Sequence, residues 1–170
     1  MTLPESVRNA IIDQIKNELQ SHYVYLGMSA HFEGTPYRGF AKWMLEQSKE
    51  EYGHAMKLYD YLRARNAKIS LRALDAPAAS YSDTPLDVFE KALAQEQSVT
   101  QQINDIYALA QQEKDFATLQ FLAWFLQEQV EEENTVSDLI DRLRLAGTNP
   151  AALLVLDDES SRRSGAVNPE

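Results

Sequence analysis

The chain has no cysteine among its 170 residues, and glycine and proline each occur only six times. Because the chain has no thiol, it cannot form disulfides, zinc–thiolate sites or iron–sulfur clusters, and it cannot use thiol catalysis. So little glycine and proline argues against a loop-rich or fibrous protein. No apolar run approaches the roughly 20 residues that span a bilayer, and the N-terminus lacks a signal-peptide pattern. We therefore expect one globular domain, located in the cytoplasm, with no membrane partner.

Basic residues are also scarce, with 16 Lys and Arg against 26 Asp and Glu, for a net charge of −10. An acidic surface repels nucleic acid and anionic membranes and concentrates cations around the protein. Solubility alone explains such a charge equally well. We expect no nucleic-acid partner.

Apolar residues recur at helical spacing in four long segments and one short segment. We expect helices over residues 2–32, 37–65, from 84–85 to about 110, 116–146, and briefly after 149–150. Thr2-x-x-Glu5 has the form of a capping box, and Thr84 before Pro85 is a suitable N-cap. Gly147 suits the position just after a helix. The fold class predicted is all-α.

The connection between the second and third helices, residues 66–83, is unusually long for a compact domain. A helix of 29 residues is about 43 Å long, whereas 18 extended residues reach up to about 59 Å. The other long helices are joined by short connections, which predict antiparallel hairpins. We therefore predict a four-helix bundle with a long crossover that makes the second and third helices parallel.

Several acidic side chains fall on the helix faces that should form the core. An isolated buried carboxylate costs several kcal/mol unless it is paired, protonated or bound to metal. One such residue could be an error in helix phase, but four at similar depth are hard to explain in that way. The set comprises Glu18, Glu51, Glu96 and Glu132, accompanied by His54 and Gln129. The nearest basic residues, Lys16, Lys49 and Lys57, point outward by phase, so divalent cations are the economical counter-charge.

The spacing Glu51-x-x-His54 places a carboxylate and an imidazole one turn apart on the same helix face. Carboxylates with one imidazole and no sulfur favour iron or manganese over copper or structural zinc. Glu51 is the natural bridge, because it lies between Glu18 and Glu96. Two metals about 3.5–4 Å apart could then be oxidised together by one dioxygen molecule, each giving one electron.

Other residues near this constellation have two explanations. Tyr25 could hydrogen-bond a ligand or supply an electron, or could simply be a core tyrosine. Trp124 is interpreted as packing, His22 as a second-sphere or surface residue, and His31 as a surface residue. A second acidic group is either a solvated face or a third cation site, because its helix-four members share one face. Its members are Glu50, Glu128, Glu131 and Glu132.

At these residues the chain resembles the non-haem bacterial ferritins over nearly its whole length. The matching motifs are Glu18 with Tyr25, Glu50-Glu51-x-x-His54, Gln95-Glu96-Gln97, Glu128-Gln129-x-Glu131-Glu132 and Leu145-Ala146-Gly147. The resemblance implies a ferritin-like di-iron domain over residues 1–160, with an exposed tail at 161–170. It also implies a homo-oligomeric, hollow 24-subunit shell that takes up Fe(II), oxidises it with dioxygen or peroxide as a ferroxidase, and stores a ferric mineral.

The same resemblance implies roles for individual residues. Glu18, Glu51 and His54 would bind the first iron, and Glu51 with Glu96 the second. Gln129 and Glu132 would lie close by. A third iron would be held by Glu50, Glu128, Glu131 and Glu132.

Two contrasts sharpen the resemblance. Bacterioferritins carry a metal-binding His on the fourth helix, and this fourth helix has none. Their haem is held by a Met two residues before the second-helix His, where this chain has Tyr52. No haem is therefore expected, although Met44 and Met56 lie on the same helix.

Two other functions remain possible at the level of the sequence. One is a di-iron or di-manganese oxidase or peroxidase that acts on a small substrate without storage. The other is a metal-free helical scaffold. The short fifth helix carries Leu153, Leu154 and Leu156, which would serve either contacts between subunits or folding back onto the bundle.

Overall fold

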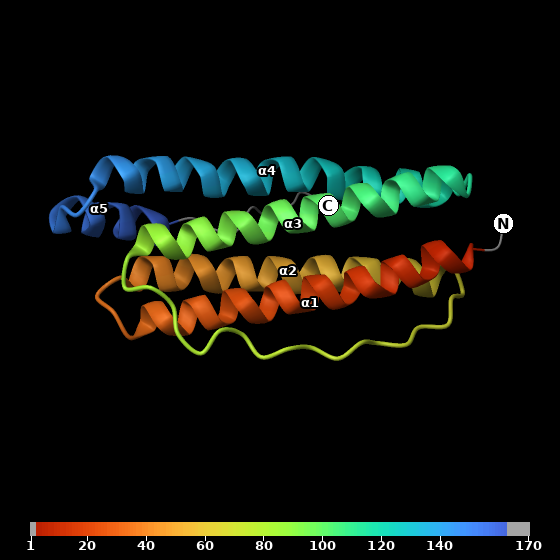
Figure 1. Cartoon of the computed structure of the whole chain (residues 1–170), viewed down its shortest axis with the longest axis horizontal. Coiled ribbons are helices and arrows are strands. Elements are labelled where there is room, and N and C mark those ends of the chain that lie inside the picture. Colours follow the sequence, from red (N-terminus) through yellow and green to blue (C-terminus); the bar gives the residue numbers. More distant parts are fainter. Residues whose placement is uncertain (1–2, 163–170) are drawn as a thin grey trace.

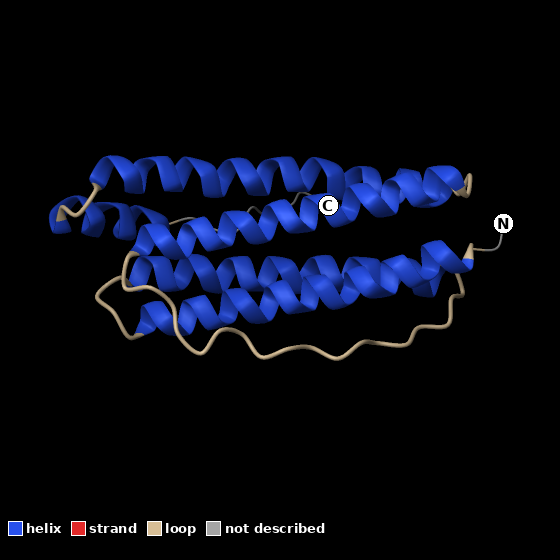
Figure 2. Ribbon diagram, in the orientation of Figure 1, coloured by secondary structure: helices blue, strands red, loops and turns tan. Residues whose placement is uncertain are grey.

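The computed structural model describes residues 3–162, and that range contains five α-helices and no strand (Figures 1 and 2). The helices are α1 (Glu5–Glu33), α2 (Arg38–Ala64), α3 (Pro85–Gln112), α4 (Phe116–Ala146) and α5 (Pro150–Ser161). The four long helices lie side by side as two hairpins, α1 with α2 and α3 with α4. The predicted all-α bundle with a short fifth helix is confirmed.

The helix ends agree with the sequence signals only in part. Gly147 follows α4 with φ = +56°, the left-handed region that favours glycine. Thr84 occupies the N-cap of α3 and Pro85 begins the helix, as predicted, although the Thr84 side chain makes no capping hydrogen bond. Instead, the backbone N–H of Thr84 donates to the hydroxyl of Ser82, which itself donates to Asp87. The N-cap of α1 is Pro4, and Thr2 lies outside the described residues.

Residues 65–84 run along the bundle beside α1 and connect the far end of α2 to the start of α3 (Figure 1). The Gln20 side chain donates to the backbone oxygen of Asp75 (2.9 Å) and accepts from its N–H (2.8 Å). Pro77 passes so close to Gly27 that an added Cβ would lie 3.0 Å from its ring. The crossover makes α2 and α3 parallel, as predicted.

The apolar core forms two clusters, one toward each end of the bundle. Tyr25, Phe40 and Phe89 belong to the cluster nearer α5, and Ile11 and Leu58 to the other. Buried polar residues lie between these clusters in the middle of the helices. The apolar ends hold the four helices in register, and this fixes the positions of the polar groups between them.

Some side chains next to the core-facing positions of the helices are only partly covered. Leu26 is 38% exposed, and His22, Phe121 and Glu128 are only half-buried. Each lies at the edge of the helix face that points toward the core. Neighbouring helices cover only the centre of that face, so side chains at its edges remain partly exposed.

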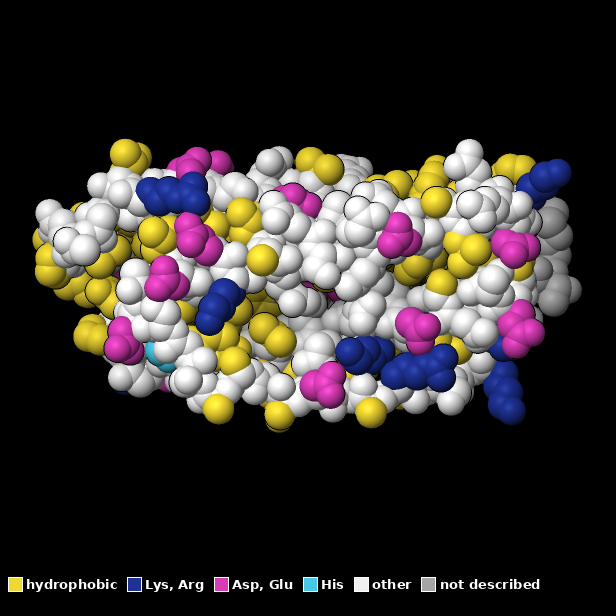
Figure 3. Space-filling model, in the orientation of Figure 1, with side chains coloured by type: hydrophobic (Ala, Val, Ile, Leu, Met, Phe, Trp, Pro, Cys, Tyr) yellow, Lys and Arg dark blue, Asp and Glu magenta, His cyan; other side chains and the backbone are white. Residues whose placement is uncertain are grey.

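The short helix α5 folds back onto the start of α2. Leu153, Leu156 and Asp157 are buried in this contact, and the N–H of Phe40 donates to Asp157 Oδ1 at 2.7 Å. Leu154 is 49% exposed, so the predicted leucine face is split between the bundle and the surface. Hydrophobic side chains also gather at this end of the face shown in Figure 3.

The C-terminal boundary differs slightly from the expected one. α5 includes Ser161, and Arg162 is exposed. Residues 163–170 of the predicted tail lie outside the described residues. Within residues 3–162, no helix is both long and apolar enough to cross a membrane.

Candidate metal centre

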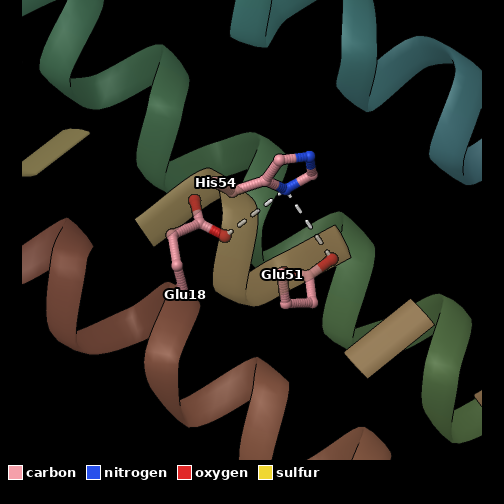
Figure 4. A group of neighbouring side chains, drawn as sticks. All are labelled: Glu18, Glu51 and His54. Carbon is pink, nitrogen blue, oxygen red and sulfur yellow. Dashed lines mark ion pairs between the residues drawn. The ribbon is translucent and has the colours of Figure 1, made fainter. Parts of the chain in front are cut away.

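Glu18 of α1 meets Glu51 and His54 of α2 at the polar middle of the bundle. Figure 4 shows both carboxylates directed toward the His54 ring. His54 Nδ1 lies 3.9 Å from Glu18 Oε2 and 3.9 Å from Glu51 Oε1. Each of the three residues offers one ligand atom, and these three atoms all lie within 4.8 Å of one another. This spacing suits three ligands around one metal ion.

The three side chains are deeply buried and poorly paired. Glu18 and Glu51 are 0% exposed, and His54 is 5% exposed. Glu18 Oε2, both carboxylate oxygens of Glu51 and His54 Nδ1 have no hydrogen-bond partner among the described residues. Unpaired buried carboxylates cost several kcal/mol. A bound cation would satisfy all four atoms at once, so the donor set fits a metal ion.

Burial also changes the protonation of these groups. Burial raises the pKa of Glu18 from 4.5 to about 7, while the hydrogen bond from Gln14 lowers it. For Glu51, burial and then the charges of Glu96 and Glu18 raise the pKa well above its ordinary value. Burial, and then the charge of Lys57, lower the pKa of His54 to about 4. In the absence of metal, burial therefore favours the neutral imidazole of His54 and the protonated forms of the two carboxyl groups.

The opposite hairpin supplies the second half of the polar layer. Glu96 of α3 is 0% exposed, and burial raises its pKa. The hydroxyl of Tyr25, itself fully buried, donates a short hydrogen bond to Glu96 Oε1. Gln129 Nε2 donates to Glu96 Oε2 at 3.3 Å. These two donors orient the carboxylate, so Tyr25 is both a core residue and a partner of a candidate ligand.

A second ligand group shares His54 with the first. One atom each from His54, Glu128 and Glu132 lie within 4.8 Å of one another. Glu132 is 4% exposed and accepts a hydrogen bond from Gln47 of α2, whereas Glu128 is half-buried. The hydrogen bond between Gln47 and Glu132 connects the two hairpins across the site.

The remaining acidic residues of the predicted third site lie farther out. Glu50 is half-buried and lines the same cavity as Glu128. Glu131 is exposed and belongs to neither ligand group found among the described residues. Burial is the main cause of the raised pKa of Glu128, and the charge of Glu131 raises it further. Glu50 also belongs to neither ligand group, so the predicted third site stays a prediction.

The two other histidines have structural surroundings. His22 Nδ1 lies 2.9 Å from Ser48 Oγ and 2.8 Å from the Ser48 carbonyl oxygen, so it joins α1 to α2. His31 is half-buried, because Tyr81 of the crossover packs beside it. The helical pattern of the sequence does not reveal that a distant segment of the chain covers a residue. Trp124 packs edge-on against His54, with ring centroids 5.5 Å apart.

Two glutamines contact the candidate ligands but were not predicted as site residues. Gln14 Nε2 donates to Glu18 Oε1 at 2.9 Å, and Gln47 is the partner of Glu132 described above. Gln14 lies four residues before Glu18, one turn away on the same face, so its position was available from the sequence. Gln47 lies four residues before Glu51 in the same way.

Known proteins resemble this chain in both fold and sequence. A family model described as a ferritin-like domain matches residues 8–146. The chain belongs to the ferritin family. The resemblance inferred from the acidic motifs is therefore confirmed at the level of the family.

Curated relatives of this ferritin-family chain include bacterial non-heme ferritins from Staphylococcus haemolyticus and Staphylococcus aureus. Each is 36% identical over 162 residues, which cover 95% of this chain and 97% of the relative. Among solved structures, the open-pore ferritin from the hyperthermophilic archaeon Archaeoglobus fulgidus is 41% identical, with a TM-score of 0.93. That match covers 95% of this chain and 99% of the other. An engineered closed form of the same ferritin matches with a TM-score of 0.92, 41% identity, and coverage of 95% and 98%.

Proposed function

We propose that this protein stores iron by taking up Fe(II), oxidising it within each subunit and holding the ferric product as a mineral. The observation that carries the proposal is the set of unpaired, buried ligand atoms on Glu18, Glu51 and His54, in a chain of the ferritin family. Iron is the substrate of this reaction, since it enters the buried site as Fe(II) and leaves that site as Fe(III).

The buried residues divide the work of binding two iron ions. Glu18, Glu51 and His54 bind the first ion. Glu51 has two oxygens without partners, so it can bridge to a second ion held with Glu96. Tyr25 and Gln129 support that role because both donate hydrogen bonds to Glu96. Each Fe(II) gives one electron to the same oxidant, dioxygen or peroxide, and the surrounding carboxylates stabilise the higher charge of Fe(III).

A third iron ion would bind at the outer acidic group. Glu128 and Glu132 supply carboxylates, with Glu50 on the same cavity wall and Glu131 close enough to affect the pKa of Glu128. This group is more exposed than the inner one, so its ion exchanges more readily with solution.

Storage requires a closed shell built from copies of this chain. The relatives and structural neighbours are ferritins, which supports a hollow homo-oligomer of 24 subunits. The exposed apolar residues of α5, Leu154 and Val155, are suited to contacts between subunits. A location in the cytoplasm and the lack of haem, nucleic-acid and membrane partners stay predictions.

The experiment that tests this function is stopped-flow oxidation of Fe(II), added stepwise to metal-free protein in air, with particle mass measured before and after heavy loading. We expect a fast phase that saturates near two irons per chain, followed by continued uptake into a large particle. Saturation without further uptake, in a small particle, would instead indicate an oxidase that acts on another substrate.

Metal binding should release protons, because burial makes the carboxyl groups of the inner site hold their protons more tightly before metal enters. Burial raises the pKa of Glu18 to about 7 and that of Glu51 well above its ordinary value, and it lowers the pKa of His54 to about 4. Binding of Zn(II) at pH 7 should therefore release protons from these carboxyl groups. Below pH 7 the apparent affinity should fall about tenfold per unit of pH for each proton displaced. Calorimetry in two buffers with different ionisation enthalpies measures this release, and an affinity independent of pH from 5 to 7 would contradict it.

A further inference from the structure

A cavity of about 470 Å³ lies between α2 and α4 and opens beside the metal ligands. Glu50, His54 and Lys57 of α2 line it, together with Trp124 and Glu128 of α4. Glu18 and Glu51 are not among its lining residues. Of the group of His54, Glu128 and Glu132, the first two line the cavity, so a metal ion that enters through it meets these two ligands before Glu18 and Glu51.

A positively charged side chain, that of Lys57, lines the same cavity. Lys57 lies one turn after His54 on α2, and its ammonium nitrogen is 3.9 Å from the ring centroid of Trp124. The face of a tryptophan ring attracts a cation at this distance. Trp124 is itself fixed by edge-on packing against His54 and Phe125. The ammonium group is thus held at the cavity although the lysine is exposed.

The position of Lys57 brings its charge close to ligands of the outer group. Lys57 follows His54 by one turn on α2, and both residues line the cavity together with Glu128. An ammonium group at this place attracts the ionised Glu128 carboxylate and repels an incoming cation.

We propose that Lys57 is a tethered cation that competes with metal ions for the outer group of His54, Glu128 and Glu132. This inference rests on the proposed function, because it assumes that the outer group binds iron. Lys57 keeps this group weaker than the inner one, so an ion bound there is released instead of being trapped. Lys57 is a positioning and affinity-setting residue, since it contacts no reacting atom.

The test is a calorimetric titration of full-length, metal-free protein with Co(II) at pH 7 and low ionic strength. Replacing Lys57→Gln should tighten the weaker class of sites about tenfold, because a unit charge next to a divalent ion is removed in a partly screened setting. Lys57→Arg keeps the charge and the contact with Trp124, so its affinity should match the wild type. In about 0.5 M salt the gain in Lys57→Gln should shrink, since exposed charges are then screened.

Lys49→Gln is the matched control. Lys49 lies on the same helix and carries the same charge, but it pairs with Glu46 on the exposed face, away from the cavity. If Lys57→Gln binds Co(II) no more tightly than Lys49→Gln, the inference is overturned while the metal centre stands. If the wild-type protein binds no Co(II) in either class, the metal centre and the inference both fail. A merely structural role for Lys57 would alter the thermal midpoint but not the salt dependence.

Discussion

Replacing Glu51→Gln is expected to slow the fast phase of Fe(II) oxidation by at least about a hundredfold. Loss of a partner that only supports a metal ligand typically costs 10–100-fold, and Glu51 is proposed to bind both ions directly. Glutamine keeps the size of the side chain but removes its charge, so the loss would report on coordination and not on packing. Stopped-flow absorbance after two Fe(II) per chain measures the rate.

Glu46→Gln is the control for this substitution. Glu46 lies on the same helix and forms an ion pair with Lys49 at the partly exposed surface. Exposed pairs of this kind contribute little to stability, so the rate should be unchanged. A Glu51→Gln protein that oxidises iron as fast as Glu46→Gln would show that the site has been assigned to the wrong residues.

The same substitution should stabilise the metal-free protein at neutral and higher pH. Burial raises the pKa of Glu18 from 4.5 to about 7 and raises the pKa of Glu51 well above its ordinary value, so the folded chain retains protons that the unfolded chain loses. The free energy of unfolding of the metal-free wild type therefore falls as the pH rises from about 4.5 through 7. Glu51→Gln removes part of this repulsion, and the metal-free protein should melt at least about 2–4 °C higher at pH 8. A calorimetric scan with chelator measures this difference, and a lower midpoint in Glu51→Gln would contradict it.

Gly39→Ala is expected to displace α5 from the bundle. A Cβ added at Gly39 would lie 1.8 Å from the backbone oxygen of Asp157 and 2.5 Å from its carbonyl carbon. Backbone atoms cannot move aside as a flexible side chain can, so α5 must shift as a unit. Overpacking of this kind costs about 1–3 kcal/mol. It would also break the hydrogen bond from Phe40 N–H to Asp157, which supplies an acceptor at an α2 start that has no acidic residue in its first turn.

Hydrogen exchange of the α5 amides measures this displacement, and Gly53→Ala is the matched control. Gly53 is also a glycine inside α2, but outside its own helical turn no atom lies within 4 Å of the Cβ that alanine would add. Alanine at such a helix position should stabilise the protein by about 0.5–1 kcal/mol and leave α5 protected. Equal protection of α5 in Gly39→Ala and in the wild type would show that the close approach is not needed to hold the helix.

The helices and the meeting of Glu51 with His54 could be predicted because their signals are local. Glu51 and His54 are three residues apart, so any helix through them brings the two side chains to one face. Glu18 and Glu96 stand where helix periodicity requires apolar residues, and both are fully buried. Edges of helix faces were less predictable. Glu128 and Glu132 are one turn apart on α4, yet only Glu132 is buried, because burial there depends on how α4 is rotated against its neighbours.

The sequence was therefore sufficient to establish the helical bundle, its crossover and an acidic, histidine-containing layer at mid-helix, since each follows from periodicity, loop length or charge. The contacts between distant segments came only from the folded chain. Phe40 and Asp157 are 117 positions apart, and Lys57 points outward by phase while its flexible stem returns the ammonium group to Trp124. Such contacts depend on the relative placement of whole helices and on side-chain conformation, and a pattern within one helix contains neither.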